Sequence, residues 1–73
     1  MDRTKESQVR QEIRRRWGNR QLNSYERSDV AHLWCQAIRE AAIDEVQRLA
    51  AIAIEELPRY TRQFEQAART RRS

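Results

Sequence analysis

Five arginines lie between residues 10 and 20, interleaved with a tryptophan and several amide side chains. A guanidinium group forms planar, paired hydrogen bonds with phosphate oxygens, an indole ring can stack on a base, and an amide can read a base edge. This combination is typical of arginine-rich helices that bind DNA or RNA. The pattern predicts phosphate contacts from Arg10, Arg14, Arg15, Arg16 and Arg20.

The same arginines also have a structural interpretation. Glu6 precedes Arg10 by four residues and Glu12 precedes Arg16 by four, which is the favourable order for ion pairs on a helix. Trp17 continues an apolar stripe at helical spacing, so we expect its ring to pack in the core rather than on a base. A solvated or internally paired basic face therefore stands as the alternative to a nucleic-acid contact.

Charge is distributed unevenly along the chain. Residues 1–20 carry seven basic and three acidic side chains, residues 21–57 carry three and seven, and residues 58–73 carry five and one. Basic ends suit either an anionic partner or the chain's own acidic middle.

In composition, residues 10–20 resemble the arginine-rich RNA-binding peptides of viruses and phages, and the resemblance covers these residues only. The C-terminal arginines could supply a second phosphate-contacting surface: Arg59, Arg62, Arg69, Arg71 and Arg72. The alternative is a disordered, solvated tail, which is the preferred interpretation of Arg71 and Arg72.

Side chains able to ligate a metal are few. Asp29, His32 and Cys35 stand at i, i+3 and i+6, but one histidine and one cysteine cannot complete a four-ligand zinc site within one chain. Glycine-rich phosphate loops and nucleophile motifs are absent from the sequence. We therefore expect no metal, no cofactor and no enzymatic activity.

The composition also constrains where the protein acts. A single cysteine excludes an internal disulfide, which fits a reducing compartment. No apolar run approaches the length of a membrane span, and there is no apolar segment of a signal peptide. These observations predict a cytoplasmic protein without a membrane partner.

The elements that position these side chains are predicted to be helices, because one glycine and one proline occur in 73 residues. The first helix is expected at about residues 4–17, with Thr4 as its N-cap and Gly18 at its end. A long central helix is expected at residues 23–57, starting with an Asn23–Glu26 capping box and stopping before Pro58.

The apolar residues of this central segment follow two stripes. Val30, Trp34 and Ile38 share one face, whereas Val46 and Leu49 belong to a second stripe rotated by roughly a quarter turn. The helix either continues and contacts different neighbours at its two ends, or kinks around residues 42–45. Because no glycine or proline occurs there, we predict a continuous helix.

A third helix is expected at residues 59–69, followed by a frayed basic tail at residues 70–73. The three helices form one small domain, residues 1–73, of the all-α class. So short a chain buries a small core, and a central helix of about 50 Å exceeds the size of a compact globule. We therefore predict a homodimeric helical bundle assembled through the central helix.

Two functions remain open on these grounds. The first is a small non-catalytic regulator that binds nucleic acid through the arginines of the first helix. The alternative is a helical protein–protein interaction module, such as an inhibitor, adaptor or assembly factor, that acts through the central helix. Its partner-binding residues are expected to be Glu40, Ile43, Asp44 and Ile54.

Overall fold

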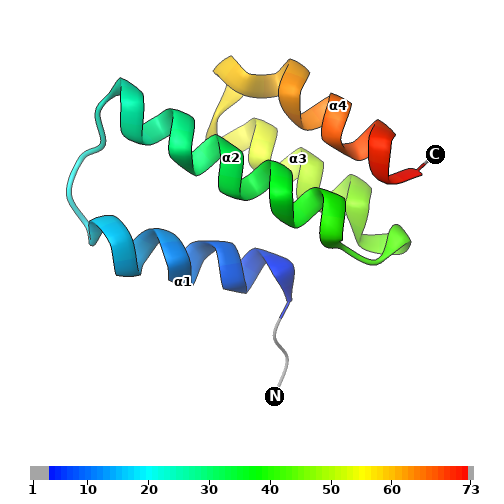
Figure 1. Cartoon of the computed structure of the whole chain (residues 1–73), viewed down its shortest axis with the longest axis horizontal. Coiled ribbons are helices and arrows are strands. Elements are labelled where there is room, and N and C mark those ends of the chain that lie inside the picture. Colours follow the sequence, from blue (N-terminus) through cyan, green and yellow to red (C-terminus); the bar gives the residue numbers. More distant parts are fainter. Residues whose placement is uncertain (1–3, 73) are drawn as a thin grey trace.

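The computed structural model describes residues 4–72, with the side chain of Arg72 left out, and these residues contain helices and no strands (Figure 1). The prediction of an all-α fold is confirmed. The segments that the structure assigns are α1 (Lys5–Trp17), α2 (Ser24–Glu40), a 3₁₀ turn (Ile43–Glu45), α3 (Val46–Glu56), a second 3₁₀ turn (Pro58–Tyr60) and α4 (Thr61–Arg72). None of these helices is long and apolar enough to cross a membrane.

The starts of α1 and α2 follow the capping residues in the sequence. The Thr4 hydroxyl accepts a hydrogen bond from the Ser7 backbone N–H at 3.1 Å. The Asn23 side chain accepts one from the Glu26 N–H at 2.9 Å, and the Glu26 carboxylate accepts one from the Asn23 N–H at 3.0 Å. Gly18 ends α1 with a φ of 65°, a conformation that glycine adopts without strain.

The prediction of one continuous helix over residues 23–57 is wrong. The helix ends at Glu40, Ala41 and Ala42 are extended with ψ values of 157° and 147°, and α3 then runs back along α2 (Figure 1). Residues 4–72 therefore contain four α-helices where three were expected. Alanine is a strong helix former, so the helix propensity of these residues does not predict the break.

Burial explains why the chain turns here. Turning at residues 41–45 brings the two rotated apolar stripes of the segment into one core, in which Ile38, Val46 and Leu49 are fully buried. Each such side chain stabilises the fold by about 1.5–3 kcal/mol, whereas each helical hydrogen bond given up costs about 1 kcal/mol net. Packing therefore outweighs helix continuity.

The last helix begins and ends differently from the prediction. Pro58 lies in a 3₁₀ turn, and α4 continues to Arg72 rather than stopping near residue 69. Residues 70–72, expected to fray, are helical, while Ser73 lies outside the described residues. The Arg71 Nε donates to the Ala41 carbonyl at 2.7 Å, so this arginine satisfies an acceptor left free where α2 ends.

The helices form a flattened array measuring 35 × 32 × 15 Å. In Figure 1, α2 lies in the centre, α1 runs antiparallel to it along one edge, and α3 and α4 cover its other side, with α4 parallel to α2. The largest fully buried side chains are Trp34, Phe64, Ile38, Leu49 and Val46, all from α2, α3 and α4. Because α3 and α4 both pack on α2, the buried core forms within one chain, and the homodimer stays a prediction.

Candidate functional site

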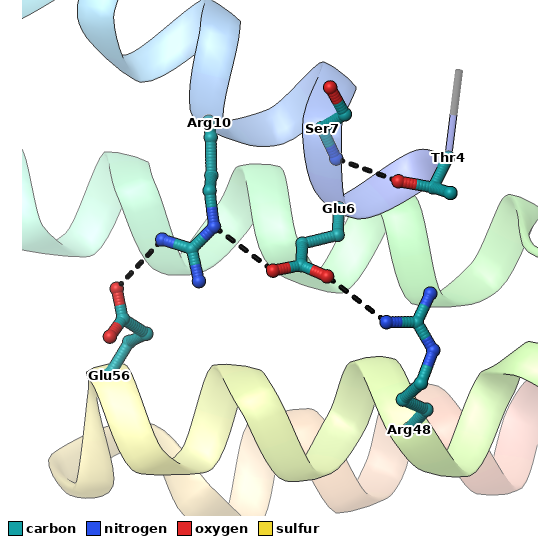
Figure 2. A network of polar contacts seen from close by, with 6 residues as sticks. All are labelled: Thr4, Glu6, Ser7, Arg10, Arg48 and Glu56. Atoms are coloured by element: carbon teal, nitrogen blue, oxygen red, sulfur yellow. Dashed lines mark hydrogen bonds and ion pairs between the residues drawn. The ribbon is translucent and has the colours of Figure 1, made fainter. Parts of the chain in front are cut away.

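Arg10, the first of the predicted phosphate contacts, lies in a network of ion pairs between α1 and α3 (Figure 2). Its Nε donates to the Glu6 Oε2 at 3.1 Å and its Nη1 to the Glu56 Oε1 at 3.2 Å. Arg48 completes the network through its Nη1, 3.0 Å from the other Glu6 oxygen. The hydrogen bond from Arg10 is the main cause that lowers the pKa of Glu6, and Arg48 adds to it against the opposing effect of burial.

The Arg10 side chain also covers the core. Its guanidinium lies over the Trp34 ring, 5.5 Å from the ring centroid, and Trp34 itself is only 1% exposed. Such an arrangement gains cation–π attraction and apolar contact from the arginine stem. Arg10 thus fastens α1 to the rest of the fold, which is the structural interpretation of the sequence pattern.

Glu12 engages two further arginines of the predicted site. The Nη2 of Arg15 and the Nε of Arg16 both donate to the Glu12 Oε2 at 2.6 Å. These hydrogen bonds, that of Arg15 first, lower the pKa of Glu12 to about 2. Arg16 also lies over the Trp17 ring, 5.9 Å from its centroid. A carboxylate in the middle of this cluster weakens its attraction for phosphate.

Arg20 pairs with the capping residue Glu26, whose pKa it lowers through a hydrogen bond. Arg14 is exposed and has no acidic partner in residues 4–72. Four of the five predicted arginines are therefore held in ion pairs within the chain, and one projects freely. Whether nucleic acid binds this face stays a prediction, but its arginines must exchange partners to do so.

The four residues predicted for a protein partner do not share one surface. Glu40 accepts hydrogen bonds from Lys5 at 3.4 Å and from Gln36 at 3.3 Å. Ile43, at 56% exposure, and Asp44 lie in the 3₁₀ turn that follows. Ile54 is half-buried in a separate groove of about 690 Å³ between α3 and α4, whose lining is Gln47, Ala50, Ala51, Ile54, Glu65, Ala68 and Arg69.

A second groove, of about 540 Å³, lies between α2 and α4 and collects basic and polar side chains. It is called the α2–α4 groove below. Its lining residues are His32, Cys35 and Arg39 from α2, and Arg59, Tyr60, Arg62, Gln63, Gln66, Ala67 and Thr70 from the last turn and α4. Arg59 and Arg62 were among the expected C-terminal contacts, whereas Arg39 was not predicted, because only the packing of α4 beside α2 reveals its place.

The charge of the α2–α4 groove has one sign. The residues that line it include three arginines and no carboxylate. Arg39, Arg59 and Arg62 are exposed and make no ion pair within the described part of the chain. Since no carboxylate neutralises them, these guanidinium groups present their donors to an incoming anion.

Cys35 lies at the base of this groove and is 6% exposed. Burial raises the pKa of its thiol, against a smaller opposing effect of Arg39, so the reactive thiolate is scarce at neutral pH. His32 also lines the groove, but Asp29 does not. Over residues 4–72 no group of three or more histidine, cysteine or acidic side chains is arranged to hold a metal ion.

Comparison with protein families, curated proteins and solved structures gives no match for this chain. Similarity to other proteins therefore contributes nothing to a functional assignment. A functional assignment has to rest on the surface side chains of the fold instead.

Proposed function

We propose that this chain is a small non-catalytic regulatory protein that binds nucleic acid, and that the α2–α4 groove is its main contact surface. The observation that carries the proposal is a set of three exposed arginines that have no ion pair within residues 4–72 and surround a groove with no carboxylate in its lining. Arginine forms paired hydrogen bonds with phosphate, and a concave surface of one charge attracts a polyanion.

The length of the groove favours a phosphate backbone over a single small anion. Arg62 and Thr70, near its two ends on α4, are eight residues apart, which corresponds to roughly 12 Å along a helix. Gln63 and Gln66 lie between them and offer amide groups that donate and accept hydrogen bonds. Such a surface can contact several consecutive phosphates and the sugars between them.

The arginines of α1 have a secondary part in this proposal. Exposed ion pairs are weak because solvent screens them, so Arg15 and Arg16 can release Glu12 for a phosphate. That carboxylate nevertheless remains beside them and repels the ligand. Arg14, which is exposed and has no ion pair among the described residues, is the α1 arginine expected to add to the affinity without such an exchange.

A matched pair of variants tests which surface binds. One carries Arg39→Gln, Arg59→Gln and Arg62→Gln, and the other carries the same change of net charge on α1, with Arg14, Arg15 and Arg16 replaced by glutamine. Fluorescence anisotropy with labelled oligonucleotides over a salt series measures affinity and its salt dependence. Each lost phosphate contact lowers the slope of log K against log salt by about 0.7–0.9.

We expect the groove variant to lose most of its affinity and about two units of slope, and the α1 variant to lose less of both. The opposite ranking would move the site to α1, as the sequence predicted. If the wild-type chain binds no nucleic acid, or binds it without any salt dependence, the proposed function is wrong. Far-UV circular dichroism of both variants checks that the helices are retained.

A protein-binding function is the second candidate. The groove between α3 and α4 is lined by small apolar side chains next to Ile54, of which Ala51 is exposed, and Ile43 is more than half exposed in the turn before α3. A partner helix fits such a surface. Recovery of one stoichiometric protein partner that survives nuclease treatment, and that Ala51→Arg abolishes, would favour this function over nucleic-acid binding.

The predicted homodimer has the same surface available to it. Glu65 and Arg69 line the α3–α4 groove and carry opposite charges. In a dimer with two-fold symmetry, Glu65 of each chain can face Arg69 of the other. Light scattering at micromolar concentration distinguishes one chain from two, and a single-chain mass would end the dimer proposal.

A further inference from the structure

Tyr25 is the most exposed large apolar side chain in the described fold. It lies in the first turn of α2 and is 85% exposed, whereas the core aromatic residues Trp34 and Phe64 are almost fully buried. It takes no part in the hydrophobic core or its packed periphery. The fold therefore gains little from this ring, and its accessible face is free to contact a ligand.

The helical repeat places Tyr25 on the same side of α2 as the α2–α4 groove. Tyr25, His32 and Arg39 are spaced by seven residues, so they follow one stripe that turns by only about 20° per step. His32 and Arg39 both line the groove. Tyr25 consequently lies on the extension of the groove toward the start of α2.

The register of the two helices shows which end of the groove Tyr25 adjoins. Arg71 contacts Ala41 at one end, and α2 and α4 run parallel (Figure 1). Since both helices rise by about 1.5 Å per residue, Arg62 lies roughly level with His32. Arg59 precedes Arg62, so the two arginines occupy the end of the groove that Tyr25 extends.

One feature opposes an anion at this end. Asp29 lies on α2 one turn before His32 and borders the stripe, although it does not line the groove. Its carboxylate is expected to repel phosphates from the α2 side. The backbone of a bound strand is therefore expected to follow the turn at Pro58–Tyr60 and α4, which carry Arg59 and Arg62, and to leave its bases facing the α2 side and Tyr25.

We propose that the ligand is a single-stranded nucleic acid, whose phosphates contact Arg39, Arg59 and Arg62 along the groove while an unpaired base stacks on Tyr25. This inference rests on the proposed nucleic-acid function and narrows its ligand. Aromatic rings beside a positively charged groove are the usual means of binding single strands, because every base offers a face for stacking.

The dimensions of the groove exclude a duplex from the same mode of binding. Axes of packed helices are about 8–10 Å apart, so the depression between α2 and α4 admits one strand and not two. A base stacked on Tyr25 must also be unpaired. A duplex could contact only the rims of the groove, through fewer phosphates, and would leave Tyr25 unused.

Fluorescence anisotropy tests the proposal with labelled oligothymidylate and oligouridylate of about 20 nucleotides. This length exceeds the stretch that one single-strand-binding domain usually contacts. A duplex of the same length is the comparison, at equal salt. We expect both single strands, or one of them, to bind more tightly than the duplex. The ratio of the affinities for oligothymidylate and oligouridylate then shows whether DNA or RNA is preferred.

The matched variants are Tyr25→Ala and Tyr25→Phe. Stacking on one aromatic ring changes affinity by roughly 5- to 140-fold, so Tyr25→Ala is expected to weaken single-strand binding by that factor, while Tyr25→Phe keeps the wild-type affinity. Binding of the duplex is expected to be the same in all three proteins. Because Tyr25 is exposed, the alanine variant should retain the helical circular dichroism of the wild type.

The possible failures differ between the two proposals. If the duplex binds as tightly as the single strands, or Tyr25→Ala binds single strands like the wild type, the single-strand proposal is wrong. The proposed function still stands in those cases, provided that the Arg39/Arg59/Arg62 variant loses salt-dependent binding. If no oligonucleotide binds the wild-type chain, both proposals are wrong.

Discussion

Replacing Arg10 by alanine is expected to destabilise the fold, although Arg10 belongs to the cluster predicted to bind phosphate. The substitution removes ion pairs to Glu6 and Glu56 and uncovers the ring of Trp34. The Arg10 side chain is 43% exposed, so solvent screens both ion pairs and each contributes only a few tenths of a kcal/mol. The cation–π contact adds about 0.5–1 kcal/mol.

With the lost packing of the arginine stem, the free energy of unfolding should fall by about 1–2 kcal/mol. A domain of this size loses about 4–8 °C of melting temperature per kcal/mol, so the midpoint should fall by roughly 5–15 °C. Thermal and urea unfolding, followed by far-UV circular dichroism and tryptophan fluorescence, measure both quantities.

Two further variants separate the contributions. Arg10→Met keeps most of the stem over Trp34 but removes the charge, so it should fall between the wild type and Arg10→Ala. Arg15→Ala removes an arginine from the same helix. Its side chain is 71% exposed and pairs only with Glu12 among the described residues, so this substitution should lower the midpoint far less than Arg10→Ala does. Raising the salt concentration should narrow the difference between wild type and Arg10→Met.

The interpretation of Arg10 as a fastening residue is refuted if Arg10→Ala and Arg15→Ala unfold at the same midpoint. It is also refuted if Arg10→Ala keeps wild-type stability but loses affinity for nucleic acid. In that second case Arg10 would contact the ligand directly, as the sequence predicted.

Three further outcomes follow from the structure. The pKa values of Glu6 and Glu26 are lowered and that of Glu12 is about 2, so the ion pairs of these carboxylates stabilise the fold fully above about pH 4.5. The melting temperature should fall as the pH drops from about 4.5 toward 2. An unchanged melting temperature in acid would contradict the pairing. The buried Cys35 thiol, with its raised pKa, should react with Ellman's reagent far more slowly than free cysteine until the chain is unfolded in urea, and equal rates would show that α4 does not cover it. Asn23→Ala should cost about 0.5–2 kcal/mol in urea unfolding, because it removes the capping box of α2, while Asn19→Ala, in the connection before it, should cost less.

Local signals were sufficient for the ends of several helices. Thr4, Gly18 and Asn23 act through hydrogen bonds and backbone conformations that involve only neighbouring residues, so the sequence alone determines them. The ion pairs Glu6–Arg10 and Glu12–Arg16 follow from helical spacing in the same way. The predicted all-α class is confirmed by the helices of residues 4–72, which contain no strand.

The sequence by itself thus determined the helical class, the starts of α1 and α2, and the charge of the two ends. Only the tertiary structure decided that the central segment turns at Ala41 and Ala42, because the gain from burying both apolar stripes depends on contacts between residues far apart in the chain. The same long-range packing pairs Arg10 with Glu56 and brings Arg39 and Arg62 to the lining of one groove. Helical spacing can describe a face of one helix, but a groove between two helices exists only once they pack.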